Sequence, residues 1–220
     1  MTELVALLGH PVAHSLSPRM HNAAFAARGL DWTYVALDVE PGRLEEAVRG
    51  LDALGFAGAN VTAPHKLAVA RIVGTDLPSV NTLLPGGAAY STDTAILDGV
   101  VCASPVIVGD GGAAAAFRQA LPGARVYSRR TMWPPDVSEA DVVINATPVR
   151  DDVLFVLHAE QTLIDLPYPR TATAEAAARA GARVYDGLDV LAAQGAQSFE
   201  LWTGVPAPVA VMRRALGLNA

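Results

Sequence analysis

The hydrophobic residues of this chain fall into short continuous runs, separated by longer segments in which apolar residues recur at helical spacing. The first run, residues 4–9, ends at a glycine, which is typical of a parallel strand covered on both faces. Ser17 and Pro18 follow and predict a helix start, with Ser17 as the N-cap. In the first half of the chain the pattern predicts strands at 4–9, 33–37 and 58–62, helices at 19–28, at 43–54 and directly after Pro64, and a hairpin formed by 79–84 and 88–90.

The same alternation starts again in the second half of the chain. It predicts strands at 106–108, 124–127, 141–145, 162–166 and 183–185, helices at 113–121 and 174–180, and one or two C-terminal helices within 197–216. Repeated alternation of strand and helix indicates a parallel, doubly wound sheet. We therefore expect an α/β protein of two domains, with an N-terminal α/β domain at 1–97 and a Rossmann-like domain at 98–196. The helix predicted at the C-terminus, 197–220, could return to the first domain.

Composition and charge exclude several classes of protein. With 51% hydrophobic and 17% charged residues, the chain is globular, and its net charge of −6 argues against nucleic acid or an anionic membrane as a partner. The apolar runs are far shorter than the roughly 20 residues that span a bilayer, and the first residues lack the pattern of a secretory signal. Cys102 is the single cysteine, which excludes an internal disulfide and a zinc site of several thiolates. We expect a cytoplasmic protein.

A glycine-rich turn opens the second half of the chain. Residues 109–114 have the spacing Gly-x-Gly-x-x-Ala directly after a predicted strand and directly before a predicted helix, the context of a dinucleotide-binding turn. Gly109 allows the tight turn and Gly111 allows a pyrophosphate to approach the backbone, while Gly112 and Ala113 start a helix whose free amides attract anions. This context favours a dinucleotide site over a merely glycine-rich connection.

The end of the next strand indicates which dinucleotide binds. Ser128, Arg129 and Arg130 lie about 20 residues after the glycine turn, where an NAD enzyme has an acidic residue for the ribose. Guanidinium groups suit the 2′-phosphate of NADP instead, although a solvated basic turn is the alternative interpretation. Asp110 places a negative charge in the glycine turn itself, and we expect it to weaken cofactor binding.

The first half of the chain contains polar residues in apolar, turn-rich surroundings. They lie in the segments 14–22 (His-Ser-Leu-Ser-Pro-Arg-Met-His-Asn), 60–66 (Asn-Val-Thr-Ala-Pro-His-Lys), 79–83 (Ser-Val-Asn-Thr-Leu) and 91–93 (Ser-Thr-Asp). Together these segments resemble the substrate-domain motifs of the shikimate dehydrogenase family. The resemblance continues through 109–114, 128–129, 144–148, 186–188 and 194–204 and covers essentially the whole chain. The string at 60–66 is the most specific of these motifs.

The resemblance implies a shikimate dehydrogenase, which reversibly reduces 3-dehydroshikimate to shikimate with NADP in the chorismate and aromatic amino acid pathway. Lys66 is implied as the general acid and base, with Asp93 as its partner; an ammonium near the reacting oxygen can supply a proton and stabilise charge. The implied substrate contacts are Ser15, Ser17, Asn60, Thr62, Asn81 and Gln194, and the further implied cofactor contacts are Asn145, Thr147, Tyr168 and Gly187. The domain at 1–97 then binds substrate and the domain at 98–196 binds NADP. The motifs around the histidines are not metal motifs, so we expect no metal ion.

The chain departs from the family pattern at several positions. Ser91 replaces an asparagine beside Asp93, Asp189 and Val190 replace glycine and methionine, and the segments at 95–100 and 130–141 are short. These departures keep open an alternative, a relative that binds shikimate or quinate but is impaired in cofactor binding and turns over slowly or not at all. Quinate as substrate, NAD as cofactor, and the choice between monomer and homodimer also stay open.

Overall fold

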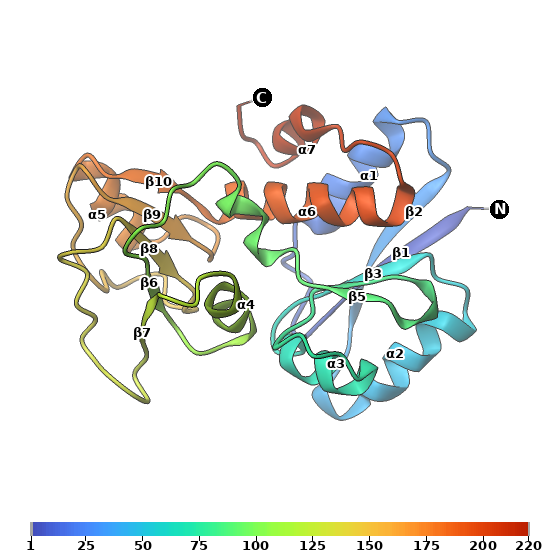
Figure 1. The fold of residues 1–220 in the computed structure, drawn as a ribbon. Coiled ribbons are helices and arrows are strands. Elements are labelled where there is room, and N and C mark those ends of the chain that lie inside the picture. Colours follow the sequence, from blue (N-terminus) through green and yellow to red (C-terminus); the bar gives the residue numbers. More distant parts are fainter. Residues whose placement is uncertain (1, 220) are drawn as a thin grey trace. The chain divides into compact units, whose positions relative to one another are not determined.

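The computed structural model describes residues 2–219 and divides the chain into two compact units. Unit 1 comprises residues up to Ala95 together with those from Leu191 onward, and unit 2 comprises Ile96–Val190. The sequence placed the two divisions after residues 97 and 196. Unit 1 is therefore built from two separate stretches of the chain, and unit 2 lies between them in the sequence (Figure 1).

The sheet of unit 1 has five strands in the order β2 (Trp32–Asp38), β1 (Glu3–Gly9), β3 (Gly58–Val61), β4 (Thr82–Leu83) and β5 (Ala89–Tyr90). β1 is parallel to both β2 and β3, whereas β4 runs antiparallel to β3, and β5 antiparallel to β4. Because β1 and β3 are parallel, the segments that follow them leave the sheet at the same edge. These segments carry most of the polar residues singled out in the first half of the sequence.

Helices cover both faces of this sheet (Figure 1). α2 (Leu44–Ala53) and α3 (Lys66–Val73) cover one face, where Leu44, Leu51 and Val69 join strand residues in a buried apolar cluster. α1 (Ser17–Ala27), the greater part of α6 (Gly187–Thr203) and α7 (Val209–Ala215) cover the other face. Both faces of β1 are therefore buried, as its continuous apolar run predicts.

Unit 2 contains a fully parallel sheet in the order β10 (Arg183–Tyr185), β9 (Thr162–Asp165), β8 (Val142–Asn145), β6 (Val106–Val108) and β7 (Arg125–Tyr127). α4 (Gly112–Ala120) contributes to the buried cluster on one face, and α5 (Ala172–Arg179) to the cluster on the other. The chain passes from β6 to β7 on one side and then to β8 on the other, so the strand order reverses at β6. Open α/β sheets bind ligands at such a reversal, beyond the carboxyl ends of the strands.

Three short 3-10 helices complete the described secondary structure, at Pro41–Arg43, Pro85–Gly87 and Asp93–Leu97. The last of these lies in the short connection into unit 2. The segment 130–141, which the sequence identifies as shortened, has no helix or strand among the described residues and takes part only in an isolated bridge between Ser128 and Met132.

Two helix starts differ from the prediction. α6 begins at Gly187, ten residues before the predicted 197, because Asp186 accepts hydrogen bonds from the Leu188 and Asp189 amides at 3.0 and 3.3 Å. The Asp189 carboxylate in turn accepts from the Asp186 amide at 3.2 Å, which completes a capping box. The carboxylate that departs from the family pattern thus stabilises the start of a helix.

The second difference is at α1. Ser17 is the first helical residue and not the N-cap, a position that Leu16 occupies. The Ser15 hydroxyl accepts the Ser17 amide at 3.2 Å, so the preceding serine turns the chain into the helix.

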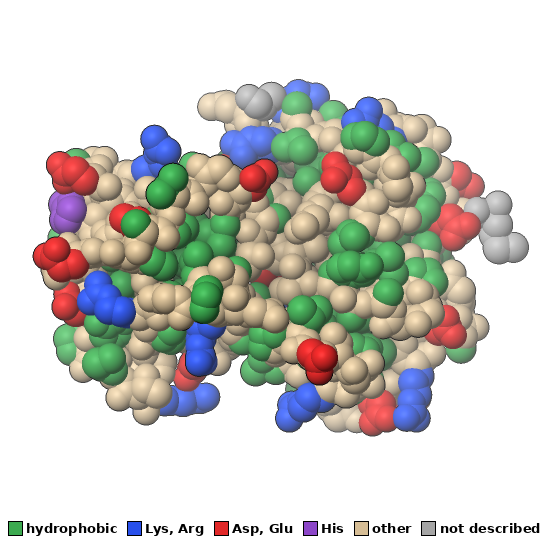
Figure 2. All heavy atoms as spheres, in the orientation of Figure 1, with side chains coloured by type: hydrophobic (Ala, Val, Ile, Leu, Met, Phe, Trp, Pro, Cys, Tyr) green, Lys and Arg blue, Asp and Glu red, His purple; other side chains and the backbone are tan. Residues whose placement is uncertain are grey.

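The described residues include no helix that combines the length and apolar character needed to cross a membrane. On the face drawn in Figure 2, basic and acidic side chains are interspersed, and the described residues form no continuous basic patch there.

Candidate functional site

A partly buried ion pair lies at the centre of the polar residues in unit 1. Lys66 is the first residue of α3 and Asp93 starts the last 3-10 helix, and the lysine Nζ lies 2.6 and 2.8 Å from the two carboxylate oxygens. The side chains are 17% and 7% exposed, so each charge has lost most of its water and depends on the other. The Lys66 side chain keeps some accessible surface, as a group that exchanges protons with a ligand needs.

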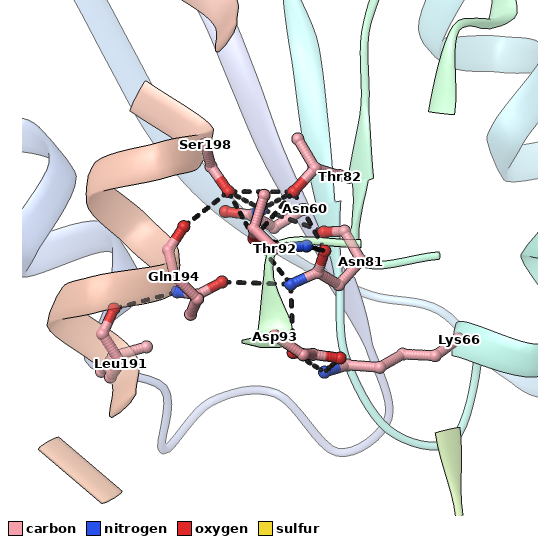
Figure 3. Close-up of polar contacts among 9 residues, drawn as sticks. All are labelled: Asn60, Lys66, Asn81, Thr82, Thr92, Asp93, Leu191, Gln194 and Ser198. Atoms are coloured by element: carbon pink, nitrogen blue, oxygen red, sulfur yellow. Dashed lines mark hydrogen bonds and ion pairs between the residues drawn. The ribbon is translucent and has the colours of Figure 1, made fainter. Parts of the chain in front are cut away.

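Asn81 extends this pair toward α6 (Figure 3). Its Oδ1 accepts the Thr92 amide at 2.7 Å, which fixes the orientation of the carboxamide. Nδ2 therefore points toward Asp93 Oδ1 at 3.1 Å and toward Gln194 Oε1 at 3.3 Å. The structure thus brings together Lys66, Asp93, Asn81 and Gln194, four residues that are distant in the sequence.

Asn60, a predicted substrate contact, takes part in internal hydrogen bonds. It is 4% exposed, its Oδ1 accepts the Tyr34 hydroxyl at 2.9 Å, and its Nδ2 donates to the Asn81 carbonyl at 3.0 Å with two further acceptors in reach. Both ends of the Asn60 amide are hydrogen-bonded, so Asn60 orders the residues around the ion pair, in line with the burial of all four residues of β3. Its contact to a substrate stays a prediction.

The remaining predicted substrate contacts lie where parallel strands leave the sheet. Thr62 follows β3, is half-buried and lies against Gly9 at the end of β1, where a Cβ would overlap the threonine methyl. Ser15 and Ser17 follow β1, with Ser15 half-buried and Ser17 buried at the start of α1. Gly9 is therefore required for the close approach of these two strand ends.

The sequence analysis missed three buried hydroxyl groups that join these residues: Thr82, Thr92 and Ser198. Thr82 directly follows Asn81, and Thr92 directly precedes Asp93. Ser198 lies four residues after Gln194, a spacing that places both on one face of α6. This spacing from a predicted substrate contact is the feature of the sequence that could have identified Ser198.

The glycine turn of unit 2 has the geometry of a phosphate-binding loop. Gly109 has φ +136, and a Cβ there would lie 2.8 Å from the Ala146 carbonyl oxygen, so neither its conformation nor its surroundings admit a side chain. Gly111 has open space around its Cα, so a ligand can approach the backbone. Gly112 and Ala113 form the first turn of α4, which directs unpaired amides toward this loop.

Two arginines stand beside this loop, because β7 is the neighbour of β6. Arg129 and Arg130 are exposed, and the Arg129 guanidinium lies 5.5 Å from the Trp133 ring centroid. Arg130 Nη1 is 3.5 Å from Asp110 Oδ2, so the carboxylate of the glycine turn pairs with one of the two arginines. Ser128 is buried and accepts the Arg130 amide at 3.3 Å, which shapes the turn that carries both guanidinium groups. This set of loop, helix start and arginines fits a dinucleotide phosphate.

Asn145, predicted to contact the cofactor, is fully buried in a polar network. Its Nδ2 donates to Asp165 Oδ1 at 2.6 Å, and its Oδ1 accepts the Thr147 hydroxyl at 2.8 Å. Thr171 donates to the other Asp165 oxygen at 2.7 Å, and burial raises the pKa of the Asp165 carboxyl. Asn145 therefore orders the backbone beside Gly109, and its contact to the cofactor stays a prediction.

Two further predicted residues lie near this network. Tyr168 is half-buried and follows β9, and Gly187 is the first residue of α6. A Cβ at Gly187 would overlap the Pro167 carbonyl, so the glycine is needed for close packing between α6 and the segment after β9. For Gly187 the structure gives a packing reason that is independent of a cofactor.

Two family models match the chain. Residues 7–80 match the shikimate dehydrogenase substrate binding domain, and residues 187–216 match the shikimate 5'-dehydrogenase C-terminal domain. The matched parts contain Ser15, Ser17, Lys66 and Gln194.

Relatives extend the similarity to nearly the full length. The chain is 40% identical to a shikimate dehydrogenase (NADP(+)) of Anaeromyxobacter sp. (strain K), covering 98% of this chain and 96% of the relative. It is 39% identical to a protein of the same name from Moorella thermoacetica, with 98% and 92% covered. The first alignment runs over 266 positions although the chain has 220 residues, so the relative contains segments that this chain lacks.

Solved structures agree with the sequence comparisons. The shikimate dehydrogenase of Aquifex aeolicus has a TM-score of 0.87 at 28% identity, with 98% of this chain and 97% of that chain covered. The enzyme of Thermus thermophilus, solved in complex with NADP(H) and shikimate, has a TM-score of 0.81 at 29% identity, with 97% and 98% covered. With identities near 40% over almost the entire chain, this protein belongs to the shikimate dehydrogenase family.

Proposed function

We propose that this protein is an NADP-dependent shikimate dehydrogenase that reversibly reduces 3-dehydroshikimate to shikimate. The observation that carries the proposal is the Lys66–Asp93 pair, in which two hydrogen bonds join a largely buried lysine to a largely buried aspartate. The polar groups around this pair suit a hydroxylated ring acid. Membership of the family and the names of the relatives support the choice of substrate and cofactor.

Lys66 carries the proton chemistry in this proposal. Reduction of the ring ketone adds a hydride to the carbonyl carbon, and the carbonyl oxygen then needs a proton. Lys66 Nζ donates that proton and stabilises the negative charge that develops on the oxygen during the transfer. Asp93 holds the ammonium in place through its two contacts, and oxidation of shikimate runs the same steps in reverse.

The neighbouring groups orient the ring. Gln194 Oε1 lies 3.3 Å from Asn81 Nδ2, the longest of the three Nδ2 contacts, so a ring hydroxyl that binds here displaces the weakest one. We assign Ser15 and Ser17 to the substrate carboxylate, in line with their position at the start of α1, and Thr62 to a ring hydroxyl. Such contacts fix the reacting carbon, which is a large part of the rate gain in bound reactants.

NADPH, when bound, supplies the hydride. The residues that would hold it are Gly109, Gly111 and the first turn of α4 for the pyrophosphate, and Arg129 and Arg130 for the 2′-phosphate. The open space at Gly111 and the exposed guanidinium groups support this assignment.

One assay tests the proposal. Purified protein, shikimate and NADP are followed at the absorbance of the reduced cofactor, and the expected result is turnover that needs both shikimate and NADP. Calorimetric binding of shikimate without turnover would contradict the proposal and favour a ring-acid binding protein, for which the Asp110–Arg130 ion pair is the supporting observation. Turnover with quinate or NAD in preference would correct the substrate or the cofactor. We further propose a cytoplasmic monomer or homodimer, which fractionation and light scattering test.

The assignment of the 2′-phosphate gives a first prediction. We expect Arg129→Ala to raise the Kd for NADP about tenfold and to leave NAD binding nearly unchanged, because a charge-assisted contact to phosphate is lost. Fluorescence titration with both reduced cofactors measures this. Arg183→Ala, which removes an exposed arginine on β10, serves as the control. Equal weakening of both cofactors would assign Arg129 to another part of the dinucleotide.

Asp110 gives a second prediction, in which the substitution strengthens NADP binding. We expect Asp110→Ala to tighten NADP binding about threefold, because a like charge leaves the phosphate loop and Arg130 loses its competing partner. The gain should shrink in high salt, since both side chains are substantially exposed. Asp151→Ala, an exposed aspartate in the same unit, is the matched control. An unchanged or weaker affinity would mean that the Asp110 carboxylate does not oppose the cofactor.

A further inference from the structure

One face of α6 runs along residues 81–83, the segment that contains β4. Gln194, Ser198 and Trp202 are spaced by four and therefore lie on the same side of the helix. They contact three consecutive residues of the sheet: Asn81 Nδ2 lies 3.3 Å from Gln194, the Thr82 hydroxyl lies 2.9 Å from Ser198, and Trp202 Nε1 donates to the Leu83 carbonyl at 3.0 Å. The helix is thus attached to the sheet at three successive turns.

Ser198 is the central attachment and joins more groups than the other two (Figure 3). Its hydroxyl is fully buried and lies 3.0 Å from Asn60 Nδ2, 3.1 Å from the Thr92 hydroxyl and 3.0 Å from the Gln194 carbonyl oxygen. A hydroxyl donates one proton and accepts two hydrogen bonds. Donation to the Gln194 carbonyl leaves both acceptor positions for the sheet, so Ser198 links the backbone of the helix to the groups beneath the ion pair.

The neighbouring side of α6, next to Trp202, packs closely on α1. Gly195 lies against α1, where a Cβ would overlap the end of the Met20 side chain. Close packing on α1 thus limits how far the helix can shift, and the hydrogen bonds to residues 81–83 fix its position along the sheet.

We propose that Ser198 is a positioning residue for the ring-acid site: it holds α6 along β4 so that the Gln194 carboxamide faces Asn81 and Asp93. The inference rests on the proposed function, since it assigns the consequence to shikimate binding. Ser198 itself is buried beneath the site and acts through Gln194 and Asn60. The Lys66–Asp93 contacts do not involve Ser198, so the proton-transfer pair keeps its geometry when the hydroxyl is removed.

The test compares Ser198→Ala with Thr203→Val. Thr203 donates to the carbonyl four residues earlier, at Phe199, at 2.8 Å, as Ser198 does at Gln194, but it lies outside the hydroxyl cluster. For Ser198→Ala we expect the KM and the calorimetric Kd for shikimate to rise about tenfold, equivalent to one lost hydrogen bond. We expect kcat to change less than twofold and the Kd for NADP to stay unchanged. Thr203→Val should keep the KM of the parent protein.

The other possible outcomes contradict the proposal, and they show whether the positioning role or the proposed function fails. An unchanged KM in Ser198→Ala removes the positioning role while the proposed function stands. An equal rise in KM in both variants, or a parallel loss of kcat, NADP affinity and melting temperature, assigns Ser198 to general helix stability. A parent protein that binds no shikimate at all contradicts the proposed function, and the inference with it.

Discussion

We expect Lys66→Met to lower kcat for shikimate oxidation by about a hundredfold to ten-thousandfold, the usual contribution of a positioned general acid and base. Methionine keeps the length of the side chain but has no proton to give or accept. Asp93 remains hydrogen-bonded to Asn81 Nδ2 at 3.1 Å, so its carboxylate is not left without a partner. Steady-state kinetics should therefore show the loss in kcat, with shikimate still binding by calorimetry. Retention of more than a tenth of the parent kcat would contradict the assigned role.

The sequence offers an independent control for this prediction, because Lys66 is the only lysine in the chain. An amine-specific reagent can modify this side chain and the α-amino group alone. We expect modification to abolish turnover and shikimate to protect against it. Loss of activity that shikimate does not slow would place Lys66 away from the bound ring.

His21 should make the fold sensitive to acid. The side chain is fully buried, stacks on Tyr34 with ring centroids 4.6 Å apart, and burial lowers its pKa from 6.5 to about 3. A group with a lowered pKa in the folded state stabilises the fold fully above its unfolded pKa, and this contribution is lost as the pH falls toward the folded pKa. Between pH 6.5 and pH 3 we expect the free energy of unfolding to fall by about 4 kcal/mol from this residue alone. Urea unfolding at several pH values measures the slope.

The matched comparison for this prediction is His21→Leu against His14→Leu. Leucine has a similar volume and cannot take up a proton, so His21→Leu should flatten the acid side of the stability curve. His14 is exposed, and its replacement should leave the curve as it is in the parent protein. Identical pH slopes for the parent and His21→Leu would show that other groups determine the acid sensitivity.

The order of strands and helices was predictable because the buried strands are apolar on both faces and appear as uninterrupted runs. The start of α6 was not, because Gly187 followed by Asp189 resembles a loop in the sequence. The hydrogen bonds between Asp186 and Asp189 convert it into a helix start. The low helix propensity of glycine and aspartate at this position is outweighed by the hydrogen bonds of the capping box.

The candidate site was predictable to a similar extent. Lys66, Asp93, Asn81 and Gln194 carry recognisable motifs, and the structure brings them together. The sequence could not show which internal hydrogen bonds the two asparagines would make. Both are buried: Asn60 binds the Tyr34 hydroxyl and the Asn81 carbonyl, whereas the Thr92 amide orients Asn81 so that its Nδ2 reaches Asp93 and Gln194. Such differences depend on partners that are remote in the sequence.

The discontinuity of unit 1 has a consequence for how the protein is made. The chain leaves unit 1 after Ala95 and returns at Leu191, so a nascent polypeptide that has reached Val190 contains every strand of both sheets. It still lacks the part of α6 that covers Phe25 and supplies Ser198 to Asn60, Thr82 and Thr92. During translation unit 2 can fold first, while the apolar face of unit 1 that α6 covers stays exposed until the last residues of α6 have been synthesised.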